Sequence, residues 1–452
     1  MANPAGAASL CRLGRVTEDW PGRWRPTEGG RLGRLRTTGA GRLGRLRTTG
    51  AGVSTDGSSG VGTAVLAAID DRETLNLLRA LIRVPSENPP GSEEAIARIL
   101  ASYFEDNGVP ARLREVRPGR PNVVAEVGSP DGPTLVFNGH LDTVPVGEGW
   151  TVDPFGGEVC DGRVYGRGAC DMLGGVAAMC AAAVALRRSD LPLNGRLVVH
   201  GVVDEEVDAI GSQLAADEVE ANWVVVTEPT GGNVYAFGKG QVNVEVTFKG
   251  RAAHSSVPDA GHNAIHDAAA FVMLVEQEHR RLTTAAEAHV GPPTFSTGVI
   301  RGGMTGSIVP ADCTVVVDRR VLPLETLEDG LAHLERLLDR LRESRPGVDA
   351  TIRPTLLFPP FPPSNDDSLA RAVQAVIREL DAGSGEIRGF AAATDAAWYA
   401  RRGSATVIYG PGDGATAHKP DEWVAVDDVH AGTQVLALVA ARLLAGIADH
   451  AR

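Results

Sequence analysis

The sequence is poor in cysteine and in long apolar stretches, and both absences exclude classes of protein. Five cysteines are spread over 452 residues without a Cys-x-x-Cys pair. This odd, scattered set predicts a reducing compartment and no disulfide framework. No uninterrupted apolar run approaches the roughly 18 residues that span a bilayer, and no signal-peptide core precedes a small-residue cleavage site. We therefore expect a cytoplasmic protein with no membrane partner.

The chain also lacks an excess of basic residues. Its net charge of −13 argues against a nucleic-acid partner. The apolar share of 43% and the charged share of 22% are those of a globular protein. Because 452 residues exceed one ordinary domain, we expect two or three compact units.

Residues 1–60 differ in composition from the remainder. They contain ten arginines, no lysine and four acidic residues, a net charge of +6. Gly30–Ala40 is repeated unchanged as Gly41–Ala51, and this Gly/Arg/Thr tandem has too little apolar surface to offset the entropy of ordering. We expect disorder here. The segment is either an RNA-binding or targeting arm or an over-extended translation start, with the true start near Val53 or Val61.

The body of the chain alternates helices with buried strands, which indicates an α/β layer around a mostly parallel sheet with helices on both faces. The expected elements are helix 71–83, a helix capped by Ser92 that ends near 107–108, strands 122–127 and 134–138, helix 174–186, and strands 196–203 and 223–227.

Beyond Gly238 the order becomes strand, helix, two strands, helix and strand, the split βαβ or ferredoxin-like order. The expected elements are strand 242–248, helix 264–281, strands 294–300 and 313–319, helix 327–342 and strand 350–356. Helix 368–380, strand 406–409 and helix 429–444 then return to the first sheet. We predict an α/β domain made of residues 61–238 and 357–452, interrupted by an α+β domain of residues 239–356.

Histidine and acidic residues follow the predicted strands. In Thr134–Pro145 a strand runs into Gly139, and then His140 and Asp142 lie on one side of an extended chain. A metal-binding histidine usually donates its other ring nitrogen to a carboxylate, and Asp142 is placed to be that partner. Alone, such a His-x-Asp pair is more often a hydrogen-bonded loop than a metal site.

Further candidates lie at equivalent places. They are Asp171 in a glycine-rich turn, Glu205 and Glu206 after a buried strand, Glu228 after another strand, and His418 in a glycine-rich loop. Neighbouring carboxylates are costly unless a positive charge compensates them, and a metal ion is the strongest compensator. Because ligands of open α/β sheets gather at the carboxyl ends of the strands, the set predicts two zinc ions sharing one carboxylate.

In their order these motifs resemble those of the di-zinc metallopeptidases and deacylases that include acetylornithine deacetylase, succinyl-diaminopimelate desuccinylase, aminoacylase and carboxypeptidase G. The resemblance covers roughly Ala64 to Leu444. It implies two Zn²⁺ per subunit, with Co²⁺ or Mn²⁺ as substitutes. The roles that it implies are His140 and Glu228 on one zinc, Glu206 and His418 on the other, Asp171 as the bridge, Asp142 as the residue that orients His140, and Glu205 as the general base.

Residues 239–356 resemble the lid and dimerisation domain of that family, which implies a homodimer. His254 matches the histidine that stabilises the oxyanion, commonly from the partner subunit. Arg320 matches an arginine that binds the substrate carboxylate, a task suited to a guanidinium fork, although Arg319 or Arg320 could instead make a salt bridge within the lid. The remaining implied substrate contacts are Asn263, Ser307 (where many relatives carry Asn), Thr394 and Asp395.

The leading hypothesis is a zinc-dependent amidohydrolase that cleaves the amide bond of N-acyl amino acids, by a hydroxide bridging the two metals and with Glu205 as general base. An alternative is a zinc carboxypeptidase or dipeptidase that acts on short peptides with the same metals. A third, a non-catalytic metal-binding protein on this fold, predicts lost ligands or a lost base, and the sequence retains them all.

Overall fold

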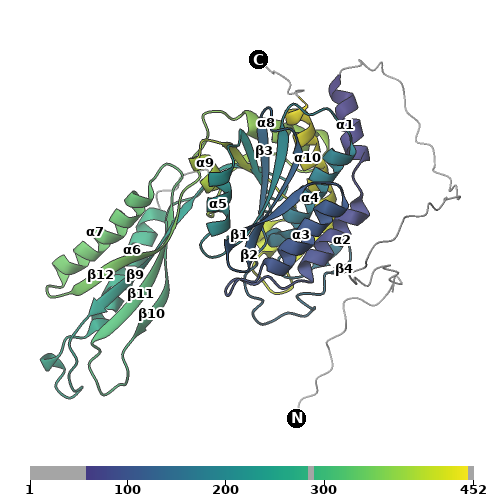
Figure 1. Cartoon of the computed structure of the whole chain (residues 1–452). Coiled ribbons are helices and arrows are strands. Elements are labelled where there is room, and N and C mark those ends of the chain that lie inside the picture. The colour runs from purple at the N-terminus through teal and green to yellow at the C-terminus, as the bar shows by residue number, and fades with distance from the viewer. Residues whose placement is uncertain (1–56, 284–289, 446–452) are drawn as a thin grey trace, which may run out of the picture. The chain divides into compact units, whose positions relative to one another are not determined.

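The computed structural model describes residues 57–283 and 290–445, so the prediction of a disordered arm lies almost wholly outside the described residues. The largest sheet has the strand order β1-β2-β6-β3-β7-β14-β8-β13 (Figure 1). Its strands are β1 (Ala111–Arg117), β2 (Arg120–Gly128), β3 (Thr134–His140), β6 (Arg196–Val202), β7 (Trp223–Val226), β8 (Val234–Gly238), β13 (Ile387–Phe390) and β14 (Ala405–Ile408). The pairs β3–β6, β3–β7, β7–β14 and β8–β13 are parallel and the other three are antiparallel. The predicted, mostly parallel sheet is confirmed.

The central strands supply side chains to two separate cores. Leu135 and Phe137 of β3 lie in one hydrophobic cluster, whereas Val136 lies in another. In β7, Val225 and Val224 divide in the same way. Because successive strand residues point to opposite faces, these uninterrupted apolar runs require cover on both faces of the sheet.

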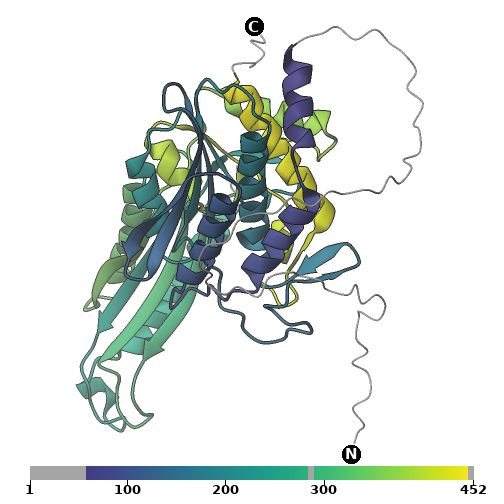
Figure 2. The ribbon, with the colours of Figure 1, turned by 45° about the vertical axis from the view of Figure 1, so that its right-hand side comes forward.

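Helices provide that cover, as predicted (Figure 1). Those packed on the first cluster are α1 (Gly57–Ala67), α2 (Asp71–Ile82), α3 (Glu94–Asp106), α4 (Gly174–Arg188), α8 (Ser368–Glu379) and α10 (Val426–Leu444). Those packed on the second are α5 (Ile210–Glu218) and α9 (Ala396–Arg401). The yellow α10 runs beside α4 in Figure 2, which joins the C-terminal segment to the core of the first half.

Helix α4 is the most enclosed of these helices. Residues Ala169–Arg188 are long and apolar enough to cross a membrane by length and composition, although 94% of the most apolar window is buried inside the protein. Its uninterrupted apolar stretch, Met172–Leu186, is bounded by Asp171 and Arg187. The alanines allow neighbouring elements to approach closely, so that the helix packs between α2, α10 and β3.

The start of one helix differs from expectation. The N-cap of α3 is Glu93, without a side-chain capping bond, and not Ser92. The Glu93 carboxylate is instead buried against Arg120 of β2. Strand β4 is Glu158–Cys160, and Cys170, Cys180 and Cys313 are free and buried.

A second sheet has four antiparallel strands in the order β10-β11-β9-β12. Its elements are β9 (Gly240–Lys249), α6 (Ala264–Thr283), β10 (Thr294–Gly302), β11 (Asp312–Val321), α7 (Leu327–Ser344) and β12 (Asp349–Phe358). The order and directions confirm the ferredoxin-like prediction, and this unit has its own hydrophobic cluster. Gly238 and Phe361 exchange two backbone hydrogen bonds of 2.7 and 3.0 Å, so the entering and leaving chains are joined.

A third, small sheet has the order β15-β5-β4, where β5 is Arg163–Tyr165 and β15 is Trp423–Ala425. It pairs two segments that are far apart in sequence. Asp171 follows β5, and His418 precedes β15 after the short helix η3 (Gly414–Thr416). The pairing thereby fixes two of the predicted ligand loops to one another.

Candidate metal centre

The carboxyl ends of the parallel strands β6, β3 and β7 lie at one edge of the sheet. His140 is the last residue of β3, Glu205 and Glu206 follow β6, and Glu228 follows β7. Asp171 lies in the turn η1 (Ala169–Leu173) that leads into α4. The topology therefore gathers the acidic strand ends, as the sequence predicts.

The Asp171 carboxylate lies between two histidines. Its Oδ1 is 3.2 Å from Nε2 of His140, and its Oδ2 is 3.2 Å from Nε2 of His418. On one side, Oε1 of Glu228 is 3.7 Å from His140, and on the other, Oε1 of Glu206 is 3.2 Å from His418.

These contacts form two groups whose donor atoms lie within 4.8 Å of one another, and both groups contain Asp171. The first also holds His140 and Glu228, and the second Glu206 and His418. All five residues predicted as ligands are thus brought together, and metal binding by them stays a prediction.

The charges of this cluster favour a cation. Burial raises the pKa of Glu228 and Glu205 well above the usual value, and the Asp171 carboxylate raises that of Glu228 further. In the described part of the chain, the only ion-pair partners of the clustered acids are His140 and His418. Imidazole nitrogen and carboxylate oxygen together suit zinc, cobalt and manganese, so the residues fit a two-metal centre.

His418 is half exposed, and its neighbours explain its titration. Hydrogen bonds to Asp171 and Glu206 raise the pKa of His418 to about 10. The imidazole is therefore protonated at neutral pH when no metal is present, and metal binding must release this proton.

Asp142 acts differently from the expectation. The ring Nδ1 of His140 lies 2.8 Å from the backbone carbonyl of Asp142, whereas the carboxylate oxygen is 3.8 Å away. The carboxylate instead accepts the backbone N–H groups of Glu205 and Glu206, both at 3.1 Å. Asp142 therefore orients His140 through its main chain and the two glutamates through its side chain.

Sequence reasoning missed the residues that hold this centre from outside. Nδ2 of Asn88 donates to Asp142 at 2.9 Å and to Asp204 at 3.0 Å. Glu422 accepts the backbone N–H of Asp171 at 3.0 Å and pairs with Arg167 at 2.6 Å. Asp204 could have been found from the sequence, since it is the first of three consecutive acidic residues. Asn88 and Glu422 reach the site only through tertiary folding, which no local pattern indicates.

Comparison with known proteins decides the family. Residues 136–442, more than half of the chain, match the model described as peptidase family M20/M25/M40. This chain belongs to the M20 family. The predicted resemblance is confirmed, and the M20 protein is a hydrolase of amide bonds in a metal-dependent family.

Relatives and structures are consistent with this membership. Acetylornithine deacetylase of Myxococcus xanthus is 33% identical over 333 residues, covering 72% of this chain and 84% of its own. A probable succinyl-diaminopimelate desuccinylase of Staphylococcus epidermidis is 25% identical over 393 residues, covering 80% and 95%.

Among solved structures, the M20 metallo-carboxypeptidase Sso-CP2 of Sulfolobus solfataricus has a TM-score of 0.69 at 21% identity, covering 83% of this chain and 99% of that chain. YXEP of Bacillus subtilis, titled a dinuclear metal binding peptidase, has a TM-score of 0.62 at 17% identity, covering 83% and 98%. At these identities the likeness shows a shared fold.

Among the described residues, the predicted substrate residues His254, Asn263 and Ser307 have no hydrogen bond to the predicted metal ligands. His254 is exposed and bonds Ser256 at 2.8 Å, and Asn263 accepts the N–H of Ile265 at 3.0 Å. Ser307 accepts the N–H of Ser255 through its backbone carbonyl at 3.0 Å. All of these hydrogen bonds remain within residues 239–356.

The two arginines of β11 have separate partners. Arg319 is buried and makes two bonds of 2.9 Å to Glu325, so it forms the salt bridge considered for this segment. Arg320 pairs with Asp318 at 3.1 Å and keeps 30% of its side chain exposed. Of the two, Arg320 is the more accessible to a substrate.

Thr394 and Asp395 are buried beneath the surface. The Thr394 hydroxyl accepts the N–H of Ala396 at 3.1 Å. Asp395 is fully buried, and burial raises the pKa of its carboxyl to about 7. Neither side chain is open to a substrate in this structure.

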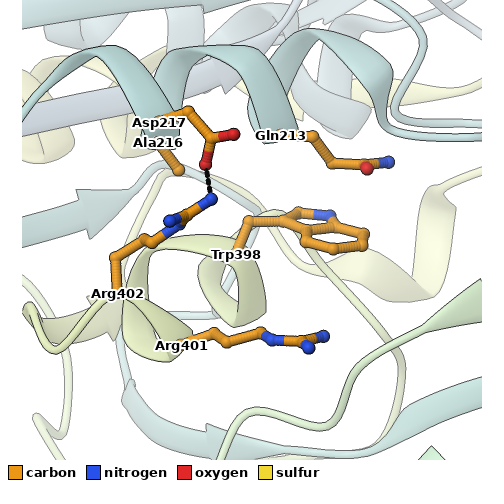
Figure 3. A pocket seen from close by; sticks show the side chains of 6 residues that line it. All are labelled: Gln213, Ala216, Asp217, Trp398, Arg401 and Arg402. Carbon is orange, nitrogen blue, oxygen red and sulfur yellow. Dashed lines mark hydrogen bonds and ion pairs between the residues drawn. The ribbon is translucent and has the colours of Figure 1, made fainter.

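A separate cavity of about 290 Å³ lies between α5 and α9 (Figure 3). Its lining residues are Gln213, Ala216, Asp217, Trp398, Arg401 and Arg402. Arg402 and Asp217 form an ion pair across it. No predicted site residue lines this cavity.

Proposed function

We propose that this M20 hydrolase is a zinc-dependent deacylase that cleaves the amide bond of N-acyl amino acids. The proposal rests on the two ligand groups that share Asp171, with Glu205 beside them. The identity of 33% to an acetylornithine deacetylase supports the substrate class. His140 and Glu228 would hold one metal, Glu206 and His418 the other, and Asp171 both.

Two bound zinc ions would polarise the scissile carbonyl and make water acidic near neutral pH. The protein positions the groups around that chemistry. Oε2 of Glu205 is 4.0 Å from Nε2 of His140, and 12% of the Glu205 side chain is exposed.

Burial raises the pKa of Glu205, and this makes it a stronger base than an exposed glutamate. It can take a proton from the attacking water and later deliver it to the departing amine nitrogen. The backbone of Glu205 is held by the Asp142 carboxylate, so the base keeps a defined position.

The test measures amino-acid release from N-acetyl and N-succinyl amino acids by the zinc-loaded protein. A chelator should abolish release, and Glu205→Ala should lower turnover by about 10²- to 10⁴-fold, the usual contribution of a general base. Glu276→Ala, on an exposed i,i+4 pair with Arg280, is the control and should behave like the wild type. A Glu205→Ala protein with wild-type turnover would refute the mechanism.

The second candidate is a carboxypeptidase or dipeptidase. It is favoured by the partly exposed guanidinium of Arg320, which suits a terminal carboxylate. A panel of dipeptides against N-acyl amino acids, compared by kcat/KM, separates the two. A non-catalytic role is disfavoured because the ligands and the base are all present.

We also propose that residues 239–356 form a lid and dimerise the protein, with His254 acting on the partner subunit's substrate. Separately inactive His254→Ala and Glu205→Ala proteins should then regain activity when mixed and reassembled. Activity regained in the mixture supports action between subunits, whereas no regain in a verified heterodimer contradicts it. Zinc as the native metal, the domain limits and a cytoplasmic location likewise stay proposals.

A further inference from the structure

A buried ion-pair network lies against the turn that carries Glu205 and Glu206. Glu93, Arg120 and Asp204 are 0%, 9% and 1% exposed. Nε of Arg120 is 2.8 Å from Oε2 of Glu93, Nη2 of Arg120 bonds Oε1 of Glu93, and the same Nη2 is 2.9 Å from Oδ1 of Asp204. One guanidinium therefore joins the start of α3, the start of β2 and the end of β6.

Asn88 continues this network into the metal centre. Its amide donates to the same Asp204 oxygen at 3.0 Å and to Oδ2 of Asp142 at 2.9 Å. The Asp142 carboxylate in turn accepts the backbone N–H groups of Glu205 and Glu206. Contacts thus run without a break from Arg120 to the proposed base and the proposed ligand.

The turn itself needs such support. Asp204 has φ of 74°, in the left-handed region that a side chain other than glycine occupies at a cost. A non-glycine residue stays there only when its surroundings hold it. The contacts of its carboxylate with Arg120 and Asn88 provide that hold, and the two glutamates follow immediately.

The charged composition of the Glu93–Arg120–Asp204 network suits a role in positioning other side chains. Burying charged groups costs desolvation energy, and well-packed apolar side chains of similar size are often at least as stabilising. An ion pair adds direction, since a guanidinium fork fixes two carboxylates at set angles. Here the Asp204 carboxylate belongs to the turn that leads directly into Glu205 and Glu206, and the Glu93 carboxylate holds the other side of the guanidinium.

We propose that Arg120 is a positioning residue of the metal centre, which acts through Asp204 and Asn88 to set the directions of Glu205 and Glu206. The role assigned to Glu205 rests on the proposed function, whereas the geometry of the ligand Glu206 can be read from a bound metal alone.

The test uses the full chain loaded with Co²⁺ as the probe. The Co²⁺ absorption spectrum, the Co²⁺ dissociation constant, kcat and KM are compared for wild type, Arg120→Met and Arg120→Lys. Arg120→Met should alter the spectrum, weaken Co²⁺ binding by about 10- to 100-fold, as residues behind metal ligands do, and lower kcat with little change in KM. Arg120→Lys, which keeps the charge but not the fork, should lie between.

The matched control is Arg196→Met. Arg196 pairs with Glu126 at 3.0 Å and joins the same strands, β2 and β6, at the opposite end of β6. It should leave the spectrum and the dissociation constant at wild-type values and lower the stability only slightly. A spectrum altered as strongly as in Arg120→Met would show a general effect of strand pairing and overturn the proposal.

A folded Arg120→Met protein with the wild-type spectrum and Co²⁺ affinity would also overturn it. If that variant does not fold, Asn88→Ala gives the same readouts without removing a charge. An unchanged Co²⁺ spectrum for Asn88→Ala would then refute the proposed role of the network. Failure of the wild type to cleave any N-acyl amino acid would refute the proposed function. The Co²⁺ comparison would then still decide whether Arg120 positions the metal centre.

Discussion

The Asp142 carboxylate accepts hydrogen bonds from three groups, and none of them belongs to the histidine ring two residues earlier. Spacing predicted that His140 and Asp142 would be partners, and the two do interact. The contact runs through the Asp142 carbonyl, because the chain bends after β3 and leaves the carboxylate facing the next strand end. A motif thus identified the participating residues, whereas the atoms involved depended on neighbours that it does not contain.

Gly175 lies where α4 closely approaches the end of β7, and this close contact requires a residue without a side chain. A Cβ built on Gly175 would lie 1.9 Å from the carbonyl oxygen of Thr227, the residue before Glu228. Gly175→Ala should therefore lower the melting temperature and weaken metal binding. Gly298→Ala is the control, since nothing lies within 4 Å of its Cβ. Equal melting temperatures for the two variants would contradict this packing argument.

His200 links protonation to stability. Its Nδ1 is 2.8 Å from the Tyr399 hydroxyl, which accepts an N–H of Asn138 at 3.1 Å and so has its own hydrogen to donate to a neutral imidazole. Burial lowers the pKa of His200 to about 4, whereas an unfolded histidine titrates near 6.5. Between these values the unfolded state binds more protons, so the free energy of unfolding falls as pH falls through this window.

The pH effect of His200 can be measured by urea unfolding at pH 7 and pH 4.5. His200→Gln should lose less stability than wild type on acidification, by up to about 3 kcal/mol. His266→Gln, at an exposed position, should retain the wild-type loss. Parallel pH curves for His200→Gln and wild type would count against a neutral buried imidazole.

At the scale of elements, strands with strong apolar patterns were predictable and weak ones were not. β3, β6 and β7 match their predicted ranges to within a few residues because each is a near-continuous apolar run buried on both faces. β1 was missed because it is an edge strand whose charged side chains alternate with partly buried ones. The three-residue strands β4, β5 and β15 exist through their pairing, which a local pattern cannot show.

Helix α7 is stabilised by a capping box at its N-terminus. The Thr326 hydroxyl accepts the N–H of Asp329 at 3.1 Å, and the Asp329 carboxylate accepts the N–H of Thr326 at 2.9 Å. Thr326→Ala should reduce the free energy of unfolding by about 1 kcal/mol, as lost helix caps do. Thr326→Ser keeps the hydroxyl and should retain most of it in urea unfolding. Identical losses for both variants would argue against the cap.

At the scale of the whole molecule, we expect the buried acids to make the stability of the protein depend on a bound metal. In the absence of a cation, the acids of the centre are compensated only by two imidazoles within the described residues. Chelation should therefore lower the melting temperature, and Zn²⁺, Co²⁺ or Mn²⁺ should restore it. A ligand at 100 times its Kd stabilises the folded state by about 2.7 kcal/mol.

Asp171→Asn provides the control for metal linkage, because Asp171 belongs to both ligand groups. Its melting temperature should respond weakly to chelator and to added metal in differential scanning calorimetry. A wild-type melting temperature that does not change with chelator or metal would be inconsistent with a metal centre in the folded protein.

The order of the strands along the chain also determines when the clustered side chains become available during synthesis. The first ligand group, His140, Asp171 and Glu228, leaves the ribosome well before His418, and β14 must still enter the sheet between β7 and β8. Since chains are made and fold from the amino end, the side chains of one proposed metal site exist together while those of the other are incomplete. The proposed site that needs His418 would therefore be completed later in synthesis than the proposed site of His140, Asp171 and Glu228.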